Sequence, residues 1–417
     1  MKNKILKNWI FFLIPFFVSC SPKNATPQYP TDFTAKNGQT TGGYGKILVG
    51  AMQPNLYLPM LKGKRVGLVV NQTSMANSST HLVDFLISKQ IKIEKIFAPE
   101  HGFRGNADAG EKVNNEIDAK TGISVVSIYG KKRKPDTKDL ENVDVLVFDI
   151  QDVGVRFYTY ISTLQYVMEA CAELKKPLLI FDRPNPNGHY VDGPMLDTAK
   201  YRSFIGMQPI PIVYGMTIGE YASMLNGEKM LTNGVQCDLK IVPCQQYSHN
   251  TFFELPVKPS PNLPNIRAIL LYPSLCFFEG TDVSVGRGTA KQFQIYGAPT
   301  YRNVEKNGFS FTPVPFEGAK EPPQQGNLCF GRDLSNEDVK KLYAEKSINL
   351  FYLRDAYERT VPKDSFFLKT NFFEKLSGND NLRKQLIEQK SAAEIRATWA
   401  TDLKKFKAIR KKYLMYR

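Results

Sequence analysis

Three short apolar runs in the first half of the chain each end in a cluster of polar residues whose types could do chemistry. The runs and their clusters are 93–98 followed by Pro-Glu-His-Gly-Phe-Arg-Gly, 145–150 followed by Gln-Asp-Val-Gly-Val-Arg, and 178–181 followed by Asp-Arg-Pro-Asn-Pro-Asn-Gly. A milder junction joins the run 65–70 to Asn-Gln-Thr-Ser. The candidate site residues at these junctions are Asn71, Glu100, His101, Arg104, Asp149, Gln151, Asp152, Arg156, Asp182, Arg183 and Asn185.

A structural explanation of these clusters stays open. Asp and Asn are ordinary turn formers and helix caps, and Gly and Pro are common in loops. That explanation fits any single cluster, but it does not account for the Glu, His and Arg residues beside the turn formers, because these types have no turn preference.

Motifs for nucleotide, serine-nucleophile and zinc chemistry are absent from the sequence. It contains no Gly-x-Gly-x-x-Gly between an expected strand and helix, no Walker A loop, no Gly-x-Ser-x-Gly elbow and no His-Glu-x-x-His. The four histidines also lack the spacing of metal ligands. We therefore expect no cofactor and no metal centre.

Carboxylates without such motifs favour acid/base chemistry, and glycoside hydrolysis is a natural form of it. That reaction needs one carboxyl that protonates the leaving oxygen and one ionised carboxylate that acts as base or nucleophile. Glu100 is the best single candidate, because it lies between Pro99 and His101 at an expected strand end. The second carboxylate is left open among Asp108, Glu111, Asp149, Asp152, Asp182 and Glu279.

The elements that must position these side chains form an α/β fold. Nearly continuous apolar runs predict strands buried on both faces, which implies a parallel sheet covered by helices. Helices are predicted at 81–89, 158–174 and 217–231, the last with a Thr217/Glu220 capping box. In such sheets ligands bind beyond the carboxyl ends of the strands, so the four clusters should converge on one edge.

Length and composition predict two domains behind a leader. We expect a signal peptide at 1–19, a flexible tether at 20–44, a Rossmann-like domain at 45–271 and a smaller α/β domain at 272–417. Several prolines between 256 and 273 mark the change of domain. The second domain should end in helices near 335–345, 379–389 and 391–413.

The N-terminus predicts export. Three lysines precede the apolar run 9–18, and Ser19-Cys20 follows it, which is the pattern of a lipoprotein signal. We expect Cys20 to be lipidated and the protein to lie at the outer membrane, on its periplasmic face. The other five cysteines are expected to form no disulfide framework.

The formal net charge of +15 is concentrated partly at 404–417. No nucleic-acid-binding motif accompanies it, so we expect no nucleic-acid partner. A basic protein outside the cytoplasm suits anionic partners such as lipid head groups or carboxylate-bearing cell-wall polymers.

Several of these segments resemble the exo-β-N-acetylmuramidase (NamZ) family. They are 99–105, 149–160, 182–186 and a loop at 278–289 that contains Glu279 and Arg287 between glycines, and the resemblance runs from about residue 47 to the C-terminus. It implies a Rossmann-like domain without dinucleotide, a smaller α/β domain and a cleft between them. It also implies Glu100 and Glu279 as catalytic residues.

The resemblance further implies release of N-acetylmuramic acid from the non-reducing end of peptidoglycan fragments, in cell-wall turnover or recycling. The lactyl carboxylate of this sugar would account for Arg104, Arg156, Arg183 and Arg287 near the cleft. Two alternatives are a non-catalytic muropeptide-binding lipoprotein and a metal-dependent hydrolase or amidase. Whether hydrolysis retains or inverts the anomeric configuration stays open.

Overall fold

The computed structural model describes residues 47–103, 115–301 and 308–416. The first domain contains a seven-stranded sheet in the order β3-β4-β2-β1-β5-β6-β7, and all its strands are parallel except the edge strand β3. The strands are β1 (Arg65–Val70), β2 (Lys92–Ala98), β3 (Glu116–Ile117), β4 (Ser124–Ser127), β5 (Val145–Asp149), β6 (Leu178–Phe181) and β7 (Leu239–Val242). Cys20, the predicted lipidation site, lies outside the described residues. So do the candidate site residues Arg104, Asp108 and Glu111.

The parallel strands follow the Rossmann order, in which the chain starts in the middle of the sheet at β1 and moves to each side in turn. The four predicted strands are β1, β2, β5 and β6, and they lie next to one another in the order β2-β1-β5-β6. Their carboxyl ends therefore share one edge, as predicted. The strand order reverses between β1 and β5, and this switch point is where such sheets bind ligands.

Apolar side chains alternate between the two faces of the sheet, and helices cover both faces. Val66, Leu68 and Val70 of β1 pack with α1 (Pro54–Leu61) and α2 (Leu82–Ser88). Phe148 of β5 packs on the other face with α4 (Tyr160–Glu173) and α6 (Ile218–Gly227). The predicted helices are confirmed, although α6 ends at residue 227 instead of 231.

Helix α6 also has the predicted capping box. The Thr217 side chain accepts from the Glu220 backbone, and the Glu220 carboxylate accepts from the Thr217 backbone. Two short helices complete the first domain, α3 (Thr137–Leu140) and α5 (Thr198–Tyr201).

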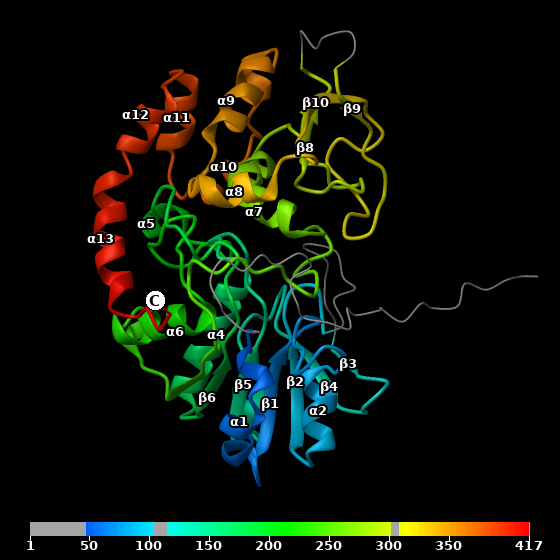
Figure 1. The fold of residues 1–417 in the computed structure, drawn as a ribbon, viewed down its shortest axis with the longest axis vertical. Helices are drawn as coiled ribbons and strands as arrows, with labels where there is room; N and C mark the ends of the chain where they lie inside the picture. The colour runs from blue at the N-terminus through cyan, green and yellow to red at the C-terminus, as the bar shows by residue number, and fades with distance from the viewer. Residues whose placement is uncertain (1–46, 104–114, 302–307, 417) are drawn as a thin grey trace, which may run out of the picture.

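The second domain packs on the carboxyl edge of the sheet (Figure 1). It has a three-stranded antiparallel sheet of β8 (Ile295–Ala298), β10 (Cys329–Asp333) and β9 (Ser310–Phe311). Its helices are α7 (Ile266–Leu275), α8 (Val339–Glu345), α9 (Leu350–Arg359), α10 (Phe372–Ser377), α11 (Asn381–Ile387), α12 (Ala392–Ala397) and α13 (Ala400–Lys411). The expected boundary after residue 271 falls inside α7.

The single helix predicted at 391–413 is wrong, because the structure has α12 and α13 there. The Ser391/Glu394 capping box opens α12 as predicted. Trp399 lies at the break between the two helices with 5% of its surface exposed, so the interruption turns this large ring into the core.

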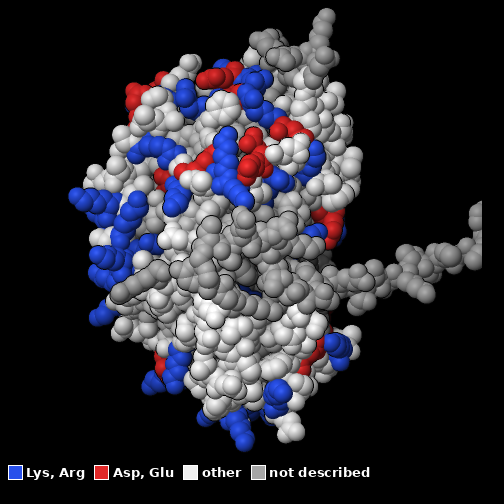
Figure 2. Space-filling view, in the orientation of Figure 1, with Lys and Arg blue, Asp and Glu red and all other residues white. Residues whose placement is uncertain are grey.

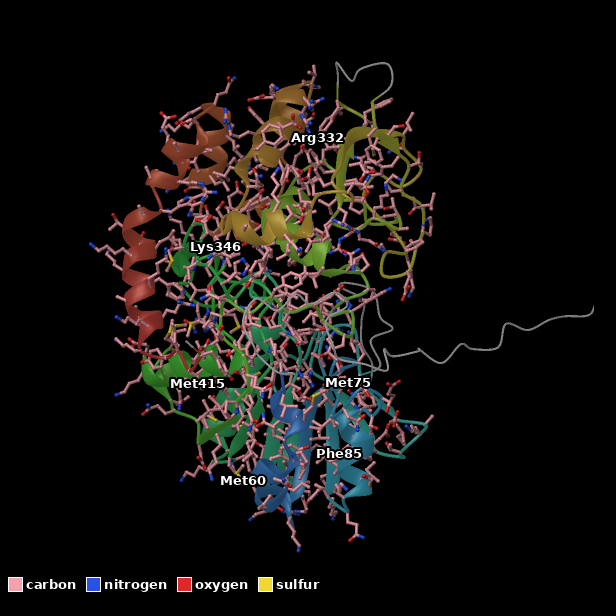
Figure 3. The ribbon with its side chains drawn as sticks, in the orientation of Figure 1. Met60, Met75, Phe85, Arg332, Lys346 and Met415 are labelled. Carbon is pink, nitrogen blue, oxygen red and sulfur yellow. The ribbon has the colours of Figure 1, made fainter. Side chains whose placement is uncertain are left out.

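The C-terminal segment returns to the first domain, where Met415 is labelled beside α6 (Figure 3). The Met415 backbone donates to Oε1 of Glu220 (2.7 Å), and the Tyr416 hydroxyl donates to Oδ2 of Asp182 (2.6 Å). One hydrophobic core also includes residues of both domains, among them Phe148 and Phe278. The two domains are thus joined by packing as well as by the chain.

Lys and Arg gather on the side of the molecule formed by α11 to α13 (Figure 2). This surface contains the basic residues predicted at the C-terminus, and α13 carries them on a helix that buries only Leu403 and Phe406. Among the described residues, no helix is both long and apolar enough to span a membrane.

Candidate active site

A cavity of about 980 Å³ lies at the carboxyl ends of β2, β4 and β5, between the two domains. Its volume is at the upper end of the range for small-molecule sites. Its polar lining from the first domain includes Glu100, His101, Tyr129, Arg133 and Thr159. The second domain contributes Glu279, Asp282, Arg287, Lys320, Glu321 and Gln324.

Glu100 reaches this cavity because a tight turn follows β2. His101 and Gly102 both have positive φ (70° and 77°), and the Gly102 backbone donates to the Pro99 carbonyl (3.0 Å). The Tyr129 hydroxyl donates to Oε1 of Glu100 (2.8 Å) and the Thr159 hydroxyl to Oε2 (2.5 Å). Both carboxyl oxygens are therefore held in place by hydroxyl groups.

His101 anchors the same turn to the loop that precedes the second domain. Its Nε2 lies 3.2 Å from Oγ of Ser260, and its side chain is buried. The contact fixes the peptide that carries Glu100 against residues on the other side of the cavity.

Glu279 enters the cavity from the opposite domain, on the short helix η3 (Cys276–Gly280). Nε of Arg287 donates to its Oε1 (2.6 Å), and the Arg287 guanidinium lies 5.2 Å from the Phe293 ring centre. Gly288 has φ of 79°, and an added Cβ would meet the Val314 carbonyl at 2.6 Å, so this loop geometry requires glycine. Arg287 is thus committed to orienting Glu279.

The other sequence-predicted site residues that the structure describes do not line the cavity. All of them are buried, and their polar atoms hold the sheet edge and the domain junction together. The residues predicted to contact substrate that lie outside this lining are Asn71, Asp149, Gln151, Asp152, Arg156, Asp182, Arg183 and Asn185.

Arg156 shows the physical reason most clearly. Its side chain is fully buried, and its guanidinium donates to the carbonyls of Pro194 (2.9 Å), Ile210 (2.8 Å) and Leu376 of α10 (2.9 Å). Burial lowers the pKa of this guanidinium to about 9. Arg156 therefore ties the first domain to the second and does not face a ligand.

Asp149 and Arg183 form a buried ion pair instead of binding substrate. Nε of Arg183 donates to Oδ1 of Asp149 (2.6 Å), and Nη2 donates to Oδ2 (2.9 Å). Nη2 also donates to the carbonyl of Met75 (3.1 Å), which Figure 3 labels at the upper end of the sheet. Burial raises the pKa of Asp149, and Arg183 opposes that shift.

Three amide side chains brace the loops around this pair. Asn71 donates to the Tyr160 hydroxyl (2.9 Å), which lies 3.5 Å from the Glu100 carbonyl. Gln151 donates to the carbonyls of Asp152 (2.8 Å) and Pro184 (2.7 Å). Asn185 donates to the Met216 carbonyl (2.8 Å). Asn71 is thus linked to Glu100 through Tyr160.

Asp182 anchors α6 and the C-terminus. Its carboxylate accepts from the Thr217 hydroxyl (2.7 Å), the Gly219 backbone (2.9 Å) and the Tyr416 hydroxyl (2.6 Å). Burial raises its pKa to about 6.

Asp152 is buried with one oxygen hydrogen-bonded and the other without a partner among the described residues. Oδ2 accepts from the Gly154 backbone (2.6 Å) and from the Tyr214 hydroxyl, and Oδ1 has no hydrogen bond. Burial raises the pKa of Asp152 from 3.8 to about 7. The native state therefore holds this proton more tightly than the unfolded chain does.

Asp152→Asn should flatten the pH dependence of stability. The contribution of Asp152 is complete below its unfolded-state pKa of 3.8 and is lost as the pH rises through about 7. Between pH 5 and pH 8 the variant should lose less unfolding free energy than wild type, by on the order of 2 kcal/mol. Urea unfolding at both pH values measures these free energies. If wild type and variant lose the same unfolding free energy between pH 5 and pH 8, Asp152 does not titrate as described. Asp182 titrates in both proteins, so its contribution to the pH dependence cancels in the comparison.

The sequence analysis missed Tyr129, Thr159, Arg133 and Asp282. Tyr129 and Arg133 follow β4, whose apolar pattern is interrupted by Ser124 and Ser127. Thr159 is the N-cap of α4. Asp282 follows Glu279 on the same loop, its Oδ1 accepts from Gln324 (2.7 Å), and burial raises its pKa.

Comparison with known proteins gives two adjoining family matches. The model of the N-terminal domain of exo-β-N-acetylmuramidase NamZ matches residues 66–267, and the model of its C-terminal domain matches residues 270–416. The chain is 41% identical over 374 residues to the peptidoglycan β-N-acetylmuramidase NamZ of Bacillus subtilis (strain 168), covering 86% of this chain and 89% of that protein.

Two crystal structures of DUF1343 family proteins from Bacteroides fragilis NCTC 9343 are also similar. One has a TM-score of 0.82 and 47% identity, and the other has 0.75 and 29%. Each alignment covers 89% of this chain and 99% of the other. Glu100 and Glu279 each lie in one of the two matched domains. With both domains matched in order along nearly the whole folded chain, the protein belongs to the exo-β-N-acetylmuramidase NamZ family.

Proposed function

We propose that this protein is a glycoside hydrolase that releases N-acetylmuramic acid from the non-reducing end of peptidoglycan fragments. The observation that carries the proposal is that Glu100 and Glu279, from different domains, line one cavity. Its substrate specificity is supported by the relative from Bacillus subtilis, which is a peptidoglycan β-N-acetylmuramidase.

The geometry gives the two carboxylates different surroundings. Glu100 is held by the hydroxyls of Tyr129 and Thr159 from the first domain, and Glu279 by the guanidinium of Arg287 from the second. Glycosidases divide proton donation and nucleophilic or base attack between two carboxyl groups, and unlike surroundings separate such roles. Asp282, whose pKa burial raises, is a third carboxyl within the same cavity.

A chromogenic N-acetylmuramic acid glycoside tests the proposal. Release of the chromophore in the presence of a chelator supports the glycosidase. Binding of the sugar without turnover would favour the muropeptide-binding module, and turnover that the chelator abolishes would favour a metal-dependent hydrolase.

We propose further that Cys20 is a lipidated first residue that holds the protein at the outer membrane, on the periplasmic face. The lysine-rich start, the apolar run 9–18 and the polar stretch after Cys20 support this proposal. Cys20→Ser should move the protein from the membrane to the soluble fraction. An intact mass of the mature wild-type protein without acyl chains would contradict lipidation.

A further inference from the structure

The loop after β4 contains four consecutive basic residues, and they are not equivalent. Lys132 forms ion pairs with Asp136 (2.7 Å) and Asp139 (2.5 Å), and Lys134 pairs with Glu173 (2.6 Å). Arg133 is exposed at the cavity and has no ion pair with a described carboxylate. Its charge is therefore available to a ligand, unlike the charges of Lys132 and Lys134.

An aromatic ring supports Arg133 in this position. Its guanidinium lies 4.5 Å from the ring centre of Phe204, which also lines the cavity. Phe204 is buried in a tight turn closed by two backbone hydrogen bonds between Ser203 and Gly206 (2.9 and 3.0 Å), and its ring stacks on Tyr166 at 6.3 Å. A guanidinium stacked on a fixed ring keeps its N–H edge open for hydrogen bonding.

The same ring connects Arg133 with the reacting carboxylate. The rings of Phe204 and Tyr129 lie 5.9 Å apart, and the Tyr129 hydroxyl donates to Glu100. Arg133 thus lies on the same wall of the cavity as Glu100, two aromatic rings away from it.

The charge of the cavity makes an available cation necessary for an acidic substrate. Among the described residues, the carboxyl groups of Glu100, Glu279, Asp282 and Glu321 line it, together with the cations Arg133, Arg287 and Lys320, so carboxyl groups outnumber cations and oppose the entry of an anion. Arg287 forms an ion pair with Glu279, so these two charges largely offset each other.

We propose that Arg133, held on Phe204, binds the lactyl carboxylate of the N-acetylmuramic acid residue that is released. Arginine binds carboxylates through two parallel N–H donors, which fixes orientation as well as charge. The proposal rests on the proposed function, because the hydrolysed sugar must be the one that carries the carboxylate. It assigns the selection of muramic acid to the first domain, beside Glu100.

The test compares Arg133→Ala with Lys131→Ala, a matched loss of charge two residues away at a side chain that does not line the cavity. The substrates are an N-acetylmuramic acid glycoside and the same glycoside with its lactyl carboxylate converted to the amide. Arg133→Ala should lower kcat/KM on the acid by roughly ten-fold to a hundred-fold and leave the amide nearly unchanged. Lys131→Ala should behave as wild type on both.

Binding separates this proposal from the proposed function. On a Glu100→Gln background, calorimetry with free N-acetylmuramic acid and N-acetylglucosamine should show a preference for the acid that Arg133→Ala removes. Loss of that preference, together with no turnover by the protein that retains Glu100, would sustain the binding site and overturn the hydrolase. Equal losses on acid and amide, or an unchanged preference, would overturn the role of Arg133.

Discussion

Glu100→Gln should abolish nearly all turnover of an N-acetylmuramic acid glycoside while the protein stays folded. Loss of a positioned acid or base alone costs about 10²-fold to 10⁴-fold, and loss of a nucleophile costs at least as much. Glutamine keeps the size of the side chain, and its amide oxygen can accept from one of the Tyr129 and Thr159 hydroxyls while its NH2 group donates to the other. The loss should therefore appear in kcat, with little change in thermal stability.

A matched control for this variant is Glu94→Gln. Glu94 lies on β2, the strand that leads to Glu100, outside the cavity, and pairs with exposed Lys92 at 3.6 Å. It should retain wild-type activity. Near wild-type rates for Glu100→Gln would remove Glu100 from the reaction.

Glu279→Gln is expected to lower kcat by about 10²-fold or more, because it removes the second carboxylate of the cavity. The role of Glu279 follows from the leaving group. If Glu279 protonates the leaving oxygen, kcat should fall far less on a nitrophenyl glycoside than on a peptidoglycan fragment, because the nitrophenolate leaving group needs little protonation. If Glu279 is the nucleophile or base, both substrates should lose activity equally.

Arg287→Ala tests whether the Glu279–Arg287 ion pair takes part in catalysis or only stabilises the loop. Arg287 orients Glu279 through one bond of 2.6 Å, so its loss should reduce kcat less than Glu279→Gln does. Equal activity losses in the two variants, with lower thermal stability in both, would show that the ion pair only supports the loop.

The strand-end clusters predicted where the site lies better than which side chains face it. The buried runs at 65–70, 93–98, 145–150 and 178–181 gave four neighbouring strands, because continuous burial leaves a clear apolar pattern. Glu100 reached the cavity as predicted. Tyr129, which orients Glu100, was missed because Ser124 and Ser127 at the ends of β4 break the apolar pattern around that strand.

Arg156 illustrates the opposite error. An arginine after a strand suggests a ligand for anions, since arginine is seldom fully buried. Here three backbone carbonyls from separate segments accept its N–H groups, and such acceptors leave no trace in the sequence. Glu279 was one of several carboxylates that the sequence left open, and the family resemblance singled it out. The packing of the two domains brings Glu279 and Arg287 to the cavity that Glu100 lines.

The most direct test of the account uses peptidoglycan fragments of defined ends. Fragments with N-acetylmuramic acid at the non-reducing end are compared with fragments that end in N-acetylglucosamine, and mass spectrometry identifies the products. The account predicts free N-acetylmuramic acid from the first set only, in wild type and not in Glu100→Gln. Cleavage inside both sets, or no sugar released from either, would contradict it.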